Sequence, residues 1–206
     1  MLIDLHVHTA YSLCSRLQVA DILANARQRG LDGICITDHD AMHIRHTLSE
    51  GLQSNGLCVI FGMEYSTPQG DFLLFGPFEE IPADLPADRL LRTVQSGAGI
   101  AVAAHPFRKA RPVDERLIQK GLCGAIESRN GRNTPLENAA ADRLRRRYEL
   151  TACGGSDAHS LGELGACATR FFVPIQTRAD LIQALKQGQC RPEVPAKGSA
   201  LTHSPE

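Results

Sequence analysis

The sequence lacks an excess of charge of either sign. Its 206 residues carry 22 Lys and Arg against 23 Asp and Glu, which gives a formal net charge of -1. Proteins that bind nucleic acid display a basic face, whereas the basic residues here are scattered. We therefore expect no nucleic-acid partner, except as a small nucleotide or oligonucleotide substrate. A protein with a net charge near zero can still contain a local site that binds an anion.

Long apolar runs are missing as well. No stretch approaches the ~20 apolar residues that a membrane-spanning helix needs, so no membrane association is expected. The first residues, MLIDLHVHTAYS, carry Asp4, His6 and His8 where a signal peptide would need an uninterrupted apolar segment. These features predict a cytoplasmic protein. The sequence does not predict the oligomeric state.

Paired cysteines are a third absence. The seven cysteines are odd in number and form no Cys-x-x-Cys motif. In a chain of this size without an export signal, this favours reduced and mostly buried thiols over a disulfide framework. Cys14 needs separate treatment because of its neighbours.

What the sequence does contain is an alternation of short apolar runs with amphipathic stretches, the pattern of β/α units around a mainly parallel sheet. Strands are expected near residues 2–5, 33–37, 58–62, 72–75, 99–104, 124–126, 150–154 and 170–173. Helices are expected near residues 19–26, 41–53, 87–96, 113–120, 135–148 and 178–186. Roughly seven repeats predict an α/β fold, in particular a distorted (β/α)7 TIM-like barrel. One domain is expected over residues 1–190, with a loose tail over residues 191–206.

Five of the eight histidines fall directly after a predicted strand, together with acidic residues. These places are residues 4–8, 37–40, 62–64, 104–106 and 155–159. The carboxyl ends of barrel strands converge, so residues distant in sequence meet there. The rings of His6 and His8 project to the same side because strand side chains alternate, and both can close on one metal. Mixed imidazole and carboxylate donors suit zinc, manganese or iron better than calcium. The sequence thus predicts a metal site at the C-terminal ends of the strands.

Five segments, DLHVHTAYS, ITDHD, GMEYSTPQGD, AAHPFR and GGSDAHS, resemble in order the motifs of the PHP family, named for polymerase and histidinol phosphatase. The resemblance covers nearly all of residues 2–190 and implies a PHP metallohydrolase domain with two or three divalent ions, Zn, Mn or Fe. It implies four ligands for the first ion: His6, His8, Glu64 and Asp157. Glu64 would bridge to a second ion shared with His105, and a third ion would take His39 and His159.

Two positions depart from the family pattern. Cys14 stands where the family usually carries an acid or a histidine, so it is either a thiolate ligand of the third ion or a small buried residue. The hairpin histidine that some members supply to the second ion has no counterpart in Leu74–Phe78. Glu127 is the candidate substitute, either as a ligand or as a group behind the ligands.

The resemblance favours hydrolysis of phosphate esters, most simply of a small-molecule phosphomonoester. A hydroxide formed on the metals is the expected nucleophile, with Asp157 essential and His159 or His39 available to protonate the leaving oxygen. Arg108, Arg129 and Arg132 are expected to bind phosphate, against the alternative that they are solvated surface residues. Two other readings stay open: a non-catalytic metal-binding regulatory or structural module, and hydrolysis of a non-phosphate bond by the same metal chemistry.

Overall fold

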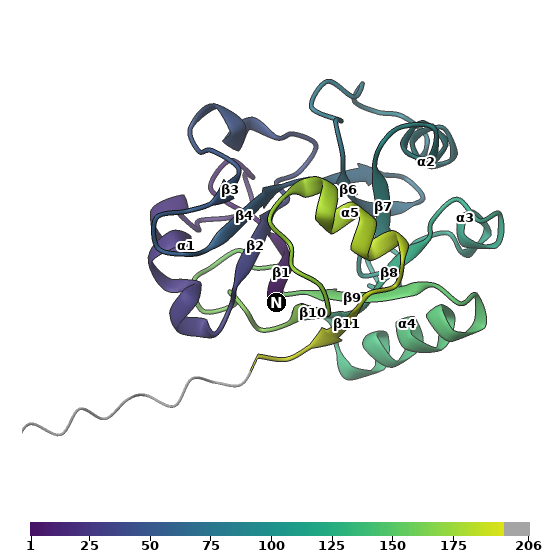
Figure 1. Cartoon of the computed structure of the whole chain (residues 1–206). Helices are drawn as coiled ribbons and strands as arrows, with labels where there is room; N and C mark the ends of the chain where they lie inside the picture. The colour runs from purple at the N-terminus through teal and green to yellow at the C-terminus, as the bar shows by residue number, and fades with distance from the viewer. Residues whose placement is uncertain (196–206) are drawn as a thin grey trace, which may run out of the picture.

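Residues 1–195 are described by the computed structural model, and their strands form two β-sheets (Figure 1). The first sheet has the order β11-β10-β1-β2-β4-β3. Its parallel centre consists of β1 (Leu2–Val7), β2 (Gly33–Ile36) and β4 (Cys58–Phe61). Antiparallel strands flank this centre: β3 (Gly51–Leu52), β10 (Ala168–Phe171) and β11 (Cys190–Glu193).

The second sheet has the order β5-β6-β7-β8-β9. It opens with the antiparallel hairpin of β5 (Met63–Thr67) and β6 (Gly70–Phe75), as the turn residues of the sequence between 65 and 70, with Pro68 and Gly70, predict. β7 (Ile100–Ala103) pairs antiparallel with β6, and the sheet continues in parallel through β8 (Ala125–Asn130) and β9 (Thr151–Gly155). Among the strands that carry the site, β1 and β2 are parallel neighbours and β7, β8 and β9 run parallel, whereas β5 belongs to the antiparallel hairpin.

The helices pack their apolar faces on these sheets. They are α1 (Val19–Asn25), α2 (Ala87–Ser96), α3 (Glu115–Gln119), α4 (Pro135–Arg147) and α5 (Arg178–Lys186). α1 packs on the first sheet, and α2, α3 and α4 pack on the second. The core between the sheets holds side chains of both, among them Leu5 and Phe75. α5 crosses the molecule between the sheets and buries Leu181 and Leu185 in that core (Figure 1). None of the helices within residues 1–195 combines the length and apolarity required to span a membrane.

The predicted α/β class is confirmed, but the closed barrel is not observed in residues 1–195, where the strands form two separate sheets. β1 pairs with the antiparallel β10 instead of β9. β9 still approaches β1 closely, since a Cβ on Gly155 would lie 2.4 Å from the Cβ of His6. Isolated bridges between Val7 and Ala158 and between His39 and Glu64 join the sheets at the site.

Two further expectations were wrong in detail. The expected helix over residues 41–53 is a single 3₁₀ turn, His43–His46, followed by β3. Gly51 has a φ of 106°, which a right-handed helix cannot accommodate. The expected tail starts too early, because β11 extends to Glu193 and pairs with β10. Pro192 is tolerated there because β11 is an edge strand. Residues 196–206 of the expected tail lie outside the described residues.

Candidate metal centre

The end of β1 presents two buried imidazoles. The Nε2 atoms of His6 and His8 lie 3.0 Å apart. On the opposite side of each ring, His6 Nδ1 lies 3.0 Å from Glu127 Oε1, and His8 Nδ1 lies 3.3 Å from Ser12 Oγ. A partner behind each ring fixes its orientation, and this is how metal-binding histidines are commonly held. Both rings therefore turn Nε2 towards the same small space.

Glu64, the second residue of β5, lies at the centre of this space. Its Oε2 is 3.3 Å from His6 Nε2 and 3.1 Å from His8 Nε2. The same oxygen is 3.3 Å from His39 Nδ1, while Oε1 is 2.7 Å from His105 Nε2. One carboxylate thus faces two sets of imidazoles, which is the arrangement a bridging ligand requires.

Asp157 and His105 lie two residues beyond the ends of β9 and β7, and both adopt positive φ, 57° and 26°. Such backbone is uncommon for non-glycine residues and concentrates at functional sites. The Asp157 amide donates to the His6 carbonyl at 2.8 Å, which ties the last motif to the first. Asp157 Oδ1 lies 3.5 Å from His8 Nε2, and Oδ2 forms an ion pair with Arg108 Nη2 at 2.6 Å.

The outer edge of the centre is formed by His39 and His159. His159 Nδ1 lies 2.9 Å from the Asp157 carbonyl oxygen and 3.0 Å from Arg132 Nη1. Because a carbonyl only accepts and Arg132 only donates, both contacts cannot be hydrogen bonds at once. We favour the proton on Nδ1, donated to the carbonyl, since this leaves Nε2 free to bind a metal.

The donor set fits divalent ions. Three groups each bring ligand atoms within 4.8 Å of one another: His6, Glu64 and His105; His6, His8 and Asp157; and His8, His39 and His159. The groups share members, so the positions they define are adjacent. The Nδ1 atoms of His39 and His105 are buried without a hydrogen-bond partner in residues 1–195. Two buried carboxylates among five imidazoles match the mixed donor set of zinc, manganese or iron.

The charges in this cluster are set by burial and by the neighbours. Burial would raise the pKa of Glu64 and Asp157, but His6 and the other histidines hold both values well below the usual range. Burial would lower the pKa of His6, but Glu127, Asp157 and Glu64 raise it. Burial lowers the pKa of His39 and of His159. The two carboxylates are thus ionised and the two outer imidazoles neutral, the forms in which they bind metal.

Glu127 and Cys14, the two departures from the family pattern, lie outside the three donor groups. Glu127 is fully buried, and besides His6 Nδ1 it accepts from the His105 amide and from Asn130 Nδ2, both at 2.9 Å. These contacts place it behind the donors. Cys14 is exposed. Its neighbours Ser12 and Ser15 make the inward contacts instead, to His8 and to the carbonyl oxygen of His159.

The three arginines have different surroundings. Arg108 lies at the centre through Asp157, and Arg132 lies beside His159. Arg129 lines a separate cavity of about 590 Å³ next to α4, and none of the metal-donor residues lines that cavity.

Several supporting residues were not identified from the sequence. Asp38 accepts from the Thr9 amide at 2.7 Å and from Ser12 Oγ at 2.6 Å, so it holds the loop behind His8. Asp4 accepts from the Ser156 amide at 2.8 Å and the Gly165 amide at 3.1 Å, which joins β1 to the last motif. Asp4 and Asp38 lie inside the quoted motifs, and that was the available signal.

Asn130 and Asn133 were not identified either. Asn130 Oδ1 lies 2.9 Å from Arg108 Nη2, and Asn133 Oδ1 lies 3.1 Å from the same atom. They lie on a segment without a recognised motif, so the sequence offered no signal for them.

The fold and the donor groups define an α/β protein with a centre for several divalent ions at its strand ends. Residues 4–129 match the PHP domain family, and residues 135–190 match a family described as PHP-associated. The first match covers more than half of the chain. The chain belongs to the PHP domain family, as its motifs predicted.

The chain is also similar to individual known proteins. A probable phosphatase from Shewanella amazonensis is 26% identical over 198 residues, covering 79% of this chain and 78% of the relative. The crystal structure of PsfC from Pseudomonas syringae PB-5123 has a TM-score of 0.75 at 21% identity, covering 96% of this chain and 92% of that one. Endonuclease Q, solved with a 27-mer duplex substrate carrying an abasic lesion, has a TM-score of 0.71 at 19% identity, covering 93% of this chain and 58% of that one. These two structural likenesses concern the fold.

Proposed function

We propose that this protein is a metal-dependent phosphoesterase that acts on small-molecule phosphomonoesters. The observation that carries the proposal is the convergence of five histidines with Glu64 and Asp157, with the Arg108 guanidinium in contact with Asp157. The membership of the PHP domain family and the similarity to a probable phosphatase support it.

Bound divalent ions would supply an activated water as nucleophile and would offset negative charge on the phosphate. We propose His6, His8, Glu64, His105, Asp157, His39 and His159 as the residues that hold them. Glu127 orients the His6 ring and the His105 backbone through its two oxygens, so it acts as a positioning residue. With the outer position empty, His39 or His159 would protonate the leaving oxygen, whereas a bound water would do so with an ion held there.

Arg108 is the proposed phosphate-binding residue. Asn130 and Asn133 fix its guanidinium, and its side chain is 25% exposed, so a substrate oxygen can reach it. A planar guanidinium pairs well with phosphate oxygens, and a prefixed one loses little conformational entropy on binding. Arg132, beside His159, is the second candidate. Arg129 lines the separate cavity, so we do not propose it for this role.

The preference for small substrates rests on the surroundings of the centre. The chain between Glu64 and His105 consists of the β5–β6 hairpin, a loop, α2 and β7, with no inserted domain. A second candidate is cleavage of phosphodiesters in nucleic acid, since endonuclease Q shares the fold. The net charge of -1 disfavours this candidate because nucleic-acid binding depends on a basic surface. A non-catalytic module is disfavoured because the donor groups are complete.

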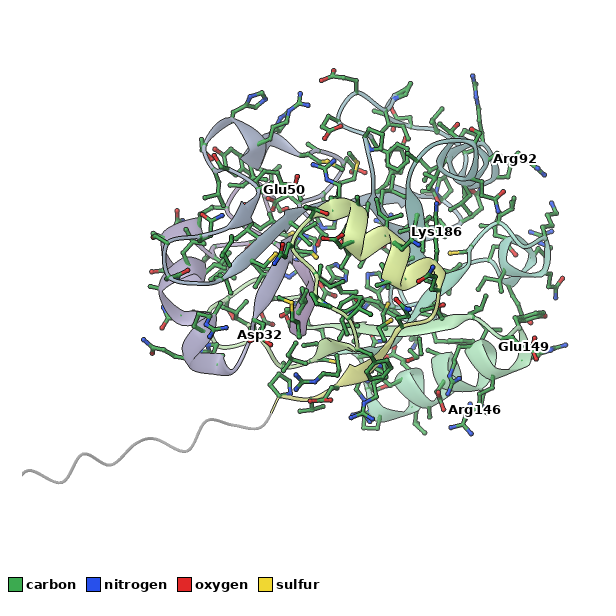
Figure 2. All side chains as sticks on the ribbon, in the orientation of Figure 1. Asp32, Glu50, Arg92, Arg146, Glu149 and Lys186 are labelled. Atoms are coloured by element: carbon green, nitrogen blue, oxygen red, sulfur yellow. The ribbon has the colours of Figure 1, made fainter. Side chains whose placement is uncertain are left out.

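The test is hydrolysis by manganese- or zinc-loaded protein of a panel of phosphomonoesters, phosphodiesters, oligonucleotides and amides. We expect release of phosphate from monoesters. Asp157→Asn serves as the inactive reference, which excludes a contaminating phosphatase, and Arg92→Ala serves as the active control. Arg92 lies on α2 at the periphery of the molecule (Figure 2). Faster cleavage of oligonucleotides or of amides would overturn the proposal, and so would the absence of any hydrolysis.

A further inference from the structure

The loop after β7 carries two arginines that reach different carboxylates. The Arg108 amide donates to the His105 carbonyl at 2.9 Å, and the Arg111 amide donates to the Arg108 carbonyl at 3.0 Å, so the loop makes two successive turns. Arg108 pairs with Asp157 at 2.6 Å, whereas Arg111 Nε pairs with Asp71 Oδ2 at 2.8 Å. One loop therefore places two guanidinium groups against two carboxylates from different strands.

Asp71, on β6, belongs to the side of the centre that carries Glu64 and His105. Its side chain is only 3% exposed. Burial raises the pKa of Asp71, the negative charge of Glu64 raises it further, and the charges of His105 and Arg111 lower it. Its Oδ1 is buried without a hydrogen-bond partner in residues 1–195. A buried carboxylate next to another carboxylate is costly, and Arg111 provides the compensating charge.

The guanidinium group of Arg111 has fewer partners and is more exposed than that of Arg108. Arg108 is occupied by Asn130, Asn133 and Asp157 and is 25% exposed. The Arg111 side chain is 49% exposed, and among residues 1–195 its guanidinium has Asp71 as its ion-pair partner through Nε. Its terminal amino groups are therefore available to a ligand, while Asp71 holds the fork in place. A surface arginine without such an anchor would lose more side-chain entropy on binding.

We propose that Arg111, held by Asp71, forms a second anion-binding subsite beside the phosphate position, for a carboxylate or second phosphate on the same substrate. This inference rests on the proposed phosphoesterase function and narrows its substrate class to phosphomonoesters that carry a second anionic group. A guanidinium and a carboxylate or phosphate form paired, charge-assisted hydrogen bonds, about twice as strong as neutral ones. If Arg111 only neutralised Asp71, it would not discriminate between substrates.

The experiment compares three substrates that differ in the group at the far end: propyl phosphate, 3-phosphooxypropanoate and propane-1,3-diyl bisphosphate. The metal-loaded protein should prefer the two substrates with a second anionic group by about tenfold in kcat/KM, mainly through KM. Arg111→Gln should remove this preference, and Arg111→Lys should restore part of it. Arg116→Gln is the matched control, because Arg116 is also paired with an aspartate, Asp114, but on α3 with its side chain 79% exposed. It should leave all three substrates unchanged.

Equal loss on all three substrates, or no loss on any, would overturn the subsite. Asp71→Asn adds a second variant: it should weaken the preference because the guanidinium is no longer held, and an unchanged preference would contradict the role of Asp71. If no ester is hydrolysed, the proposed function fails, and calorimetric titration of the bisphosphate and of propyl phosphate tests the subsite separately. Equal binding of the bisphosphate by native and Arg111→Gln protein would then refute it.

Discussion

The space between the two sheets is filled in opposite ways at its two ends. Along β1, Ile3 and Leu5 enter an apolar core that α5 covers with Leu181 and Leu185. One and three residues after Leu5, at the end of β1, His6 and His8 enter a cluster of buried charges with Glu64 and Asp157. The apolar end is closed to solvent, whereas the polar end opens at its outer edge, where the His39 side chain is 35% exposed.

The two ends contribute different properties: the apolar end stabilises the fold, and the polar end provides the groups for the chemistry. The apolar end contributes burial of hydrocarbon, about 25 cal/mol per Å². The polar end imposes the cost of buried charges, which only mutual pairing or a bound cation offsets. We therefore expect changes at the polar end to remove function with little loss of structure, and changes at the apolar end to do the reverse. The effects below are ordered from the largest to the smallest.

The largest effect should follow Asp157→Asn. The substitution keeps the shape of the side chain but removes a donor charge and the partner of Arg108. We expect phosphomonoester turnover to fall by about a thousandfold or more, which corresponds to roughly 4 kcal/mol. The far-UV circular dichroism spectrum and the cooperative unfolding transition should be retained. Near-native turnover with metal in excess, or loss of the folded spectrum, would contradict the expectation that the polar end determines function and the apolar end stability.

At the apolar end, Leu185→Ala should lower the free energy of unfolding by about 3 kcal/mol, because it leaves a cavity in the core. Leu185 is fully buried, whereas Gln183 on the same helix is exposed, so Gln183→Ala is the control. Urea unfolding measures the loss, and elemental analysis measures divalent metal per chain. We expect at least two equivalents in native protein and in both variants. A loss of metal in Leu185→Ala below its unfolding transition would show that the two ends are coupled.

Glu127→Gln tests the boundary between the ends, because Glu127 holds His6 and the His105 amide from behind. Loss of such a supporting carboxylate weakens metal affinity by about 10- to 100-fold. Competition with a chelator measures the change, and turnover should recover at high metal concentration. Glu149→Gln is the control, since Glu149 lies exposed at the outer edge of the molecule (Figure 2). If Glu127 were itself an essential ligand, added metal would not restore activity.

The comparison between the ends also explains how much of the fold the sequence could predict. Helices with a strong apolar period were predicted well, such as α2, whose bounds Ala87–Ser96 match the expectation. The region after β2 was not, because residues 41–53 have a helical pattern of apolar residues but contain Gly51 at a positive φ. The prediction of a closed barrel was wrong because strand pairing depends on contacts between distant parts of the chain. β10 pairs with β1 in the position that β9 would occupy in a closed barrel.

Within the site, the structure brings together the predicted residues whose positions follow from β-strand alternation or from the family motifs. His6, His8, Glu64 and Asp157 meet within a few ångströms of one another. Residues that act from behind the donors were missed, such as Asn130 and Asp71, because their partners lie far away in sequence. Asp71 ends the quoted third motif, whereas Asn130 lies in no recognised motif. The assignment of Cys14 depended on the direction of one side chain in a loop, which spacing does not determine.

The smallest effect should therefore come from Cys14. Ser12 and Ser15 make the inward contacts of its loop, and Cys14 is exposed while the other six cysteines are buried. Partial burial raises the pKa of the Cys14 thiol, so a thiolate is not favoured without a metal bond.

Iodoacetamide should alkylate one cysteine per native chain, at the same rate with metal bound and after chelation. Cys14→Ser should remove this reaction and leave the metal content and turnover within about twofold, since a solvated side chain contributes little to a buried centre. Cys35→Ser is the contrasting variant. Because Cys35 is fully buried and should not react in the native protein, its replacement should leave the alkylation of one cysteine unchanged. Protection of Cys14 by metal, together with loss of one metal equivalent in Cys14→Ser, would instead identify the thiol as a ligand and extend the polar end of the interior to the surface loop.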